Sequence, residues 1–134
     1  MLFPKTGRVV IVDDMIREAQ PVMETLSKYG IPYIYLQGDL ESLPQPDQLV
    51  DLRILILDLN LKAETIASTD SDEKNFKSRM YALLKKIIPQ GTRYMLVVWG
   101  KEEDTYLKYL KELFSNTLEN YKPFRSFSLK KSDY

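Results

Sequence analysis

The chain has 134 residues with 19 basic and 19 acidic side chains, so its formal net charge is zero. This length suits one domain with a single core, and the balanced charge provides no field that would attract nucleic acid or an anionic membrane. The sequence contains no histidine and no cysteine. That excludes Ser-His-Asp and Cys-His catalysis, disulfides, iron–sulfur clusters and zinc sites built from those residues. Any chemistry must therefore rest on carboxylates, amines, hydroxyls or a hard cation bound by oxygen.

The sequence shows no targeting or membrane-spanning segment. The N-terminal residues lack the apolar region of a signal peptide, and no apolar run approaches the roughly 20 residues needed to cross a bilayer. We therefore expect a cytoplasmic protein that makes no direct contact with a membrane or with nucleic acid.

Apolar runs of strand length alternate with segments of helical period. Arg8–Val12 is rich in β-branched residues and predicts a first strand. Apolar side chains spaced by three and four over 16–29 predict a helix that Gly30 ends. Pro21 lies inside this segment, where it either starts the regular helix or kinks it. Ile31–Gln37 predicts the second strand.

The middle of the chain continues the alternation. Gly38–Leu52 contains two prolines, so any helix there is expected to be short. Arg53–Asp58 is continuously apolar up to its last residue, which predicts a third strand buried on both faces. Leu61–Asn75 is polar and predicts a loop inserted after that strand. Phe76–Ile88 has the apolar period of a helix.

The last third predicts a fourth strand over Thr92–Trp99, a long helix over Glu102–Tyr121 and a fifth strand over Arg125–Lys130. This order predicts an α/β domain spanning 1–134, with a doubly wound parallel sheet and helices on both faces. We expect the flavodoxin-like strand order 2-1-3-4-5. We expect no helix after the fifth strand, and the sheet face left exposed favours a homodimer or a position at the N-terminal end of a longer protein.

Charged residues follow the strands at the edge where ligands bind in such sheets. Asp13 and Asp14 end the first strand, Asp58 ends the third, and Lys130 ends the fifth. The carboxyl ends of parallel strands meet at one edge, so the three carboxylates should lie together with an amine opposite. Oxygen ligands of this kind suit Mg²⁺. Lys131 competes with Lys130 for the amine's role, and strand alternation separates the two.

Three stretches of this sequence resemble the receiver domain of two-component response regulators. They are VIVDD at Val10–Asp14, LILDLNL at Leu55–Leu61 and FSLK at Phe127–Lys130. The resemblance implies a signalling phosphoprotein of a phosphorelay. Such a domain receives a phosphoryl group from a histidine kinase or phosphotransfer protein and then alters its contact with a downstream protein or an additional domain. It is a phosphoacceptor rather than a turnover enzyme.

The resemblance also implies individual roles. Asp13 and Asp14 would form an acidic pocket for Mg²⁺, and Asp58 would be both a metal ligand and the phosphoacceptor. Asn60 would give its backbone carbonyl to the metal, and Lys130 would contact the phosphoryl group. In a purely structural alternative, the acids cap turns, with Asp14 capping the first helix.

Three further residues are candidates for a conformational switch: Trp99, Gly100 and Phe127. Phe127 lies where receivers place a switch aromatic, three residues before the lysine. Receivers carry Ser or Thr at the end of the fourth strand, where this chain has Trp99 or Gly100, and neither offers a hydroxyl. This difference motivates an alternative function, a pseudo-receiver that binds proteins without phosphorylation. A hydrolase with an aspartate nucleophile is a third hypothesis, weakened because Asn60 stands where its second acid is expected.

Overall fold

The computed structural model describes residues 9–39, 41, 43, 49, 52–59, 69–100 and 104–130. Its sheet has five parallel strands in the order β2-β1-β3-β4-β5, which confirms the predicted flavodoxin-like α/β fold. The strands are β1 (Val9–Val12), β2 (Tyr33–Leu36), β3 (Ile54–Asp58), β4 (Met95–Gly100) and β5 (Arg125–Lys130).

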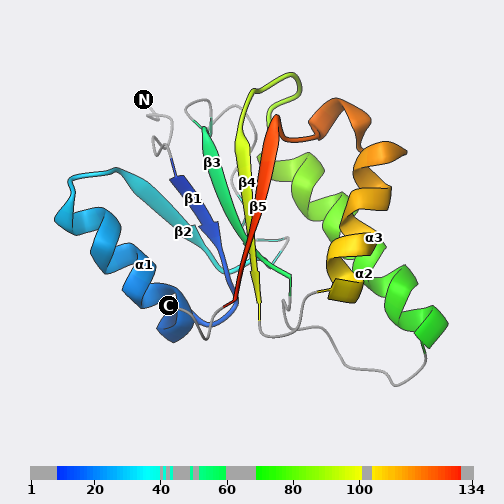
Figure 1. Ribbon diagram of the computed structural model, residues 1–134, viewed down its shortest axis with the longest axis horizontal. Coiled ribbons are helices and arrows are strands. Elements are labelled where there is room, and N and C mark those ends of the chain that lie inside the picture. The colour runs from blue at the N-terminus through cyan, green and yellow to red at the C-terminus, as the bar shows by residue number, and fades with distance from the viewer. Residues whose placement is uncertain are drawn as a thin grey trace.

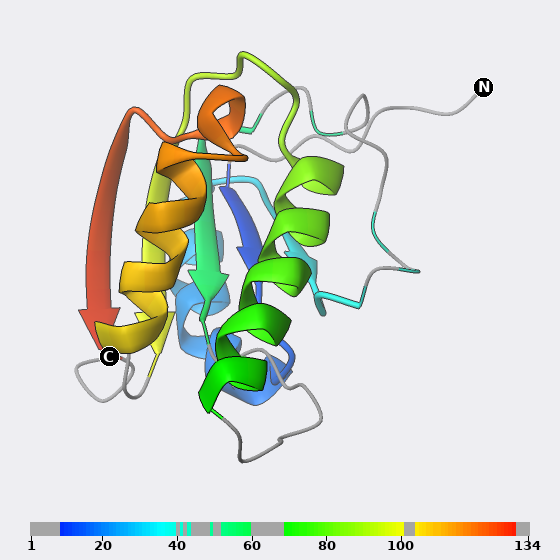
Figure 2. The same ribbon diagram turned by 90° about the vertical axis from the view of Figure 1, so that its right-hand side faces the viewer.

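Helices cover both faces of the sheet. Figure 1 shows α1 on one side and α2 and α3 on the other, and Figure 2 views the sheet from the side of α2 and α3. The helices are α1 (Ile16–Lys28), α2 (Thr69–Ile87) and α3 (Asp104–Ser115), followed by the short 3₁₀ helix η3 (Glu119–Tyr121).

The alternation of side chains along the strands divides the core into two clusters. The larger cluster joins α2 and α3 to the sheet and includes Val10, Val12, Leu55 and Leu57. The smaller cluster lies under α1 and consists of the buried residues Val9, Ile11, Ala19, Val22 and Trp99. Strand β1 contributes to both clusters and is buried along its whole length, as expected for an inner strand of a parallel sheet.

Helix α1 continues through a proline. It begins at Ile16 and ends at Lys28 with Pro21 inside it, so Pro21 does not start the helix. Proline has no backbone N–H, which leaves the carbonyl of Arg17 without its usual intrahelical donor. Gly30 follows the helix with φ of 69°, a left-handed conformation that favours glycine at this position.

Helix α2 starts earlier than the sequence predicts. Its first residue is Thr69, so the expected loop over Leu61–Asn75 is wrong for its last seven residues. The run from Thr69 to Glu73 is polar, so it lacks the apolar period that predicts a helix. Residues 61–68 of that predicted loop lie outside the described ranges, as does most of the expected short helix within Gly38–Leu52.

The predicted helix over Glu102–Tyr121 is also corrected, because α3 ends at Ser115 and a turn separates it from η3. The Ser115 hydroxyl donates to the carbonyl of Lys111 at 3.1 Å, and the Asn116 amide donates to the carbonyl of Glu112 at 2.9 Å. Side chains of this kind compete with the helical backbone for hydrogen bonds and favour the end of a helix.

An ion network joins α2 to α3. The Lys77 ammonium lies 2.9 Å from a carboxylate oxygen of Glu73 and 2.6 Å from one of Glu112. Hydrogen bonds to these carboxylates raise the pKa of Lys77, and the Lys77 ammonium lowers the pKa of Glu112. Beside them the rings of Phe76 and Tyr106 are stacked, with centroids 4.8 Å apart.

Tyr94 anchors the start of β4 within the larger cluster. Its ring is buried, and its hydroxyl donates to the carbonyl of Tyr121 at 2.6 Å. Burial raises the pKa of Tyr94 well above its ordinary value, because the charged phenolate would be desolvated. The observed strand begins after Tyr94, at Met95, three residues later than predicted.

No helix among the described residues has both the length and the apolar character that crossing a membrane would need.

Candidate metal site

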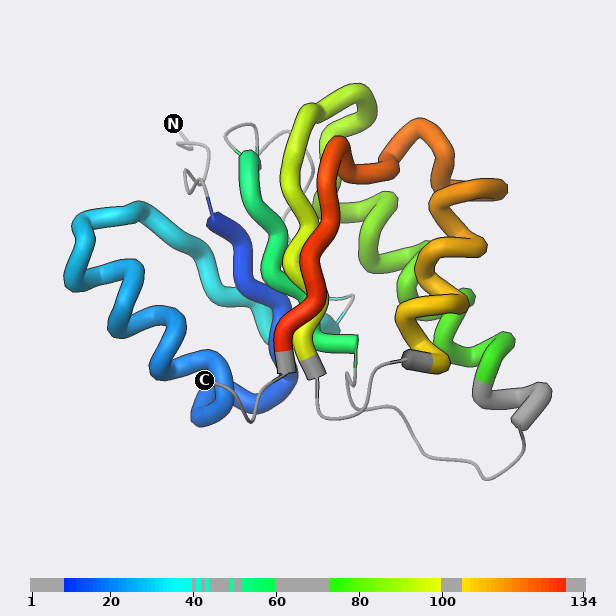
Figure 3. The backbone as a smooth tube through the Cα atoms, in the orientation of Figure 1, coloured from blue at the N-terminus to red at the C-terminus, as the bar shows by residue number. Residues whose placement is uncertain are grey.

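The carboxyl ends of the strands lie at one edge of the sheet, the lower edge in Figure 3. Asp13 directly follows β1, and Asp58 is the last residue of β3. Because β1 and β3 are hydrogen-bonded neighbours with Val12 opposite Leu57, the two aspartates are brought to the same level of the sheet.

Asp13, Asp14 and Asp58 form an acidic cluster. One carboxylate oxygen from each residue lies within 4.8 Å of the other two. Asp13 is 0% exposed and Asp58 1% exposed, and these are the two charged residues buried within the described ranges, whereas Asp14 is half-buried. Buried carboxylates are costly unless they are hydrogen-bonded, paired or bound to a cation.

Local hydrogen bonds fix the position of Asp13. Its backbone N–H donates to the carbonyl of Leu36 at 3.1 Å, and its Oδ1 accepts from the backbone N–H of Met15 at 2.9 Å. The Tyr35 hydroxyl donates to the Asp13 backbone carbonyl at 2.5 Å. The carboxylate thus caps the turn into α1 through one oxygen, while β2 holds the main chain from the side.

Tyr35 was not a site residue in the sequence analysis. The signal was present, because alternation within β2 places Tyr33 and Tyr35 on one face of the strand and the order 2-1-3 makes β2 the neighbour of β1. A tyrosine near the end of β2 can therefore reach the residue that follows β1.

Trp99 lies next to the acidic cluster. It is opposite Asp58 in the register of β3 and β4, it is 2% exposed, and it packs in the smaller cluster under α1. Asp58 follows Ile54 and Ile56 in strand alternation, and both isoleucines pack on that same cluster. The end of β4 thus presents a large apolar side chain beside the acids and no hydroxyl.

The structure describes the other predicted site residues only in part. Gly100 ends β4 opposite Lys130, which ends β5 one residue beyond the level of Asp58 and Trp99. The side chain of Lys130 and the whole of Asn60 lie outside the described part of the chain. Phe127 lies in the middle of β5, opposite Val97, with 48% of its surface exposed.

The acidic cluster suits a hard divalent cation. Oxygen ligands of an octahedral Mg²⁺ lie about 2.9 Å apart when adjacent and about 4.2 Å apart when opposite. The spread of up to 4.8 Å among the three carboxylate oxygens is close to this range, and carboxylates are the donors that Mg²⁺ prefers. The residues therefore could hold a metal ion of this class.

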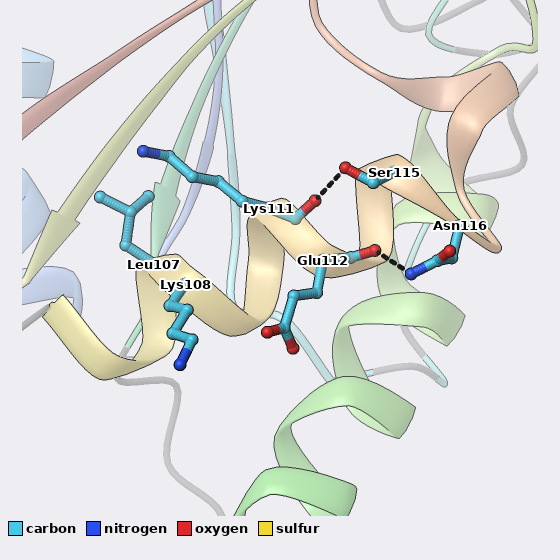
Figure 4. Close-up of a pocket in the computed structure, with 6 residues that line it drawn as sticks. All are labelled: Leu107, Lys108, Lys111, Glu112, Ser115 and Asn116. Carbon is cyan, nitrogen blue, oxygen red and sulfur yellow. Dashed lines mark hydrogen bonds between the residues drawn. The ribbon is translucent and has the colours of Figure 1, made fainter.

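A surface depression on α3 has no comparable chemistry. None of the acidic cluster residues lines it, and the hydrogen bonds within it join neighbouring turns of the same helix (Figure 4). Its lining residues are Leu107, Lys108, Lys111, Glu112, Ser115 and Asn116.

Comparison of the chain with protein-family models, curated proteins and solved structures finds no match.

Proposed function

We propose that the chain is a receiver-like signalling domain of the cytoplasm that binds Mg²⁺ and accepts a phosphoryl group on Asp58. The observation that carries this proposal is the acidic cluster, in which oxygens of Asp13, Asp14 and Asp58 lie within 4.8 Å of one another at the carboxyl edge of the sheet. In open α/β sheets this edge, near the switch in strand order, is where ligands bind.

The cation and the carboxylates have complementary roles. Mg²⁺ bound here would offset the repulsion among three carboxylates and neutralise charge on phosphoryl oxygens. Asp13 is held in place by Met15 and Tyr35, so it is a preorganised ligand. Asn60 and Lys130 complete the proposed site through the resemblance, with a backbone carbonyl for the metal and an ammonium for the phosphoryl group.

In the proposed transfer, a carboxylate oxygen of Asp58 attacks the phosphorus of a phosphohistidine on a histidine kinase or phosphotransfer protein. An O–P bond forms and the N–P bond breaks. The imidazole nitrogen keeps the bonding electrons and takes up a proton from water, while the phosphoryl group remains on Asp58 as an acyl phosphate. The donor must come from another protein because this chain contains no histidine.

One observation favours the alternative function, a pseudo-receiver that binds partners without phosphorylation. Trp99 is buried at the end of β4, opposite Asp58, where receivers carry a hydroxyl directed at the phosphoryl group. A missing hydrogen-bond donor lowers transition-state stabilisation. The indole also occupies space beside the acids.

A small-molecule phosphodonor distinguishes the two functions. The purified chain is incubated with acetyl phosphate and Mg²⁺ and measured by intact mass spectrometry. The receiver proposal predicts the added mass of one phosphoryl group, labile to hydroxylamine, in the native chain and in Asp39→Asn. It predicts no addition in Asp58→Asn. Absence of the adduct from the native chain rules out phosphorylation of Asp58 by this route and supports the alternative.

Metal binding is measured separately through the single tryptophan. Because Trp99 lies opposite Asp58, its fluorescence should change saturably with Mg²⁺ in the native chain and not in Asp58→Asn. A metal response without an adduct identifies a site that binds the cation but does not accept phosphate. No response in the native chain contradicts the metal site itself.

A further inference from the structure

Strand β5 forms an open edge of the sheet. It pairs with β4 and has no second neighbour among the described strands, and Figure 2 shows it at the outer side of the sheet. Its residues from Arg125 to Leu129 are all exposed, whereas those of β2 at the opposite edge are buried or half-buried. An uncovered edge presents unpaired backbone N–H and C=O groups that another strand can bind.

The same strand carries apolar side chains on one face. Phe127 is 48% exposed and Leu129 45% exposed, and their register positions lie beside Val97 and Trp99 of β4. Trp99 packs against residues of α1 and β1, so α1 covers the centre of this face of the sheet. Phe127 and Leu129 belong to neither core cluster and extend an apolar surface to the edge.

The charged residues within the two strands at this edge are basic. Strands β4 and β5 contain no acidic residue, and β5 begins with Arg125 and ends with Lys130. Before it, the guanidinium carbons of Arg93 and Arg125 lie 4.4 Å and 5.8 Å from the centroid of the Phe124 ring. The whole chain has a net charge of zero, so the two arginines at Phe124 are a local concentration of positive charge at the start of β5.

We propose that the β5 edge binds an acidic segment of a partner protein in extended conformation. The segment's backbone pairs with β5, and its alternate apolar side chains contact Phe127 and Leu129. A carboxylate next to them on the same face meets Arg125, beside which Arg93 lies on the Phe124 ring. Strand addition of this kind takes affinity from the main chain and specificity from alternate side chains. Charge complementarity selects an acidic partner.

The same charges favour an acidic segment over a second copy of this chain as the occupant. An antiparallel pair of β5 strands that keeps the apolar faces together places residues of equal parity opposite each other. In such a pair β5 offers no acidic residue to Arg125 of the other copy. An acidic segment supplies that opposite charge, which stabilises a strand pair.

The probe is the peptide Glu-Ser-Val-Ser-Val-Ser-Glu with blocked ends, whose Glu and Val side chains share one face of the strand, added to the ¹⁵N-labelled full chain. We expect saturable amide shifts in β5 and the adjacent β4, with a dissociation constant of a millimolar or tighter. Phe127→Ser should weaken binding by about tenfold or more, in the range of a central contact residue. Tyr81→Ser, which removes another exposed ring on α2, should leave binding unchanged.

Two altered peptides test the two parts of the mechanism. Replacing Glu by Lys should abolish binding, and methylating alternate backbone nitrogens of the peptide should do the same because it removes the donors. The proposal is overturned if either altered peptide binds as well as the original, if the original does not bind, or if the shifts lie outside β4 and β5. A stable dimer by sedimentation, with β5 amides protected from exchange, also overturns it.

This inference is independent of the acidic cluster. Asp58→Asn should bind the peptide with unchanged affinity, so failure at one site leaves the other standing.

Discussion

The effect of Asp58→Asn on stability should depend on Mg²⁺. The substitution should stabilise the folded protein without the cation, and this advantage should shrink or be lost when the cation is added. Two unit charges 4.8 Å apart, the largest separation in the acidic cluster, repel by about 3.5 kcal/mol at an effective dielectric constant of about 20. The half-buried Asp14 is partly screened by water. We therefore expect Asp58→Asn to raise the free energy of unfolding by about 1–3 kcal/mol in the absence of divalent cations.

Mg²⁺ should stabilise the native chain instead. A ligand that binds only the folded state adds about 2.7 kcal/mol at a concentration 100 times its dissociation constant. Asp58→Asn loses one of three carboxylate ligands and should gain much less. The stability difference between the two proteins should therefore shrink or change sign with the cation.

The assay is urea unfolding followed by circular dichroism, in EDTA and in MgCl₂, with NaCl added to equalise ionic strength. Glu24→Gln is the matched control, because it makes the same carboxylate-to-amide change at an exposed residue of α1. Its stability should change little in either buffer. The reasoning is refuted if Asp58→Asn lowers stability in EDTA, or if Mg²⁺ stabilises both proteins equally.

Three further changes test the physical account of the fold. Tyr94→Phe removes the 2.6 Å hydrogen bond to the Tyr121 carbonyl and should cost about 1–2 kcal/mol at neutral pH. Burial raises the pKa of Tyr94 above its ordinary value of 10.0, so the native chain should lose stability as the pH rises above that value, and the variant should lose less. Pro21→Ala restores an N–H that can bind the Arg17 carbonyl and should stabilise the protein by about 1–2 kcal/mol. Gly30→Ala should cost about 1 kcal/mol through its positive φ alone, because an added Cβ meets nothing within 4 Å.

Each stability change is measured as a shift of the urea midpoint, with the same transition slope used for the native chain and the variant. Equal alkaline losses in Tyr94→Phe and the native chain would contradict the role given to burial. The control for Pro21→Ala is Gln20→Ala at the neighbouring exposed residue. An equal gain in stability from both substitutions would show that the missing proline N–H is not the cause. A neutral Gly30→Ala would mean that the backbone relaxes out of the left-handed region.

The fold was predictable because each inner strand is a short apolar run with its own helical segment or turn after it. Alternation of these elements predicts a parallel sheet, and Val9–Val12 shows why, since β-branched residues buried on both faces suit an inner strand. Element ends were predicted less well. Periodicity cannot detect the polar first turns of α2, and it misses the hydrogen bonds of Ser115 and Asn116 that end α3.

The acidic cluster was predictable for a similar reason. Asp13 and Asp58 each follow an apolar strand, and parallel strands end at one edge. The hydroxyl of Tyr35 on the Asp13 carbonyl was not foreseen, because it depends on the distance between side chain and main chain across strands. The order of residues along the chain does not give this distance.

The acidic cluster joins two parts of the protein with unequal cores. Asp13 and Asp14 lie on the link from β1 to α1, whose helix is held by the smaller core cluster, and Asp58 lies on β3, which also packs against the larger one. Segments with less buried apolar surface open more readily in native-state hydrogen exchange. A cation that ties Asp14 to Asp58 would therefore slow exchange in α1 more than in α2. Exchange rates along α1 would then report occupancy of a site that the helix itself does not form.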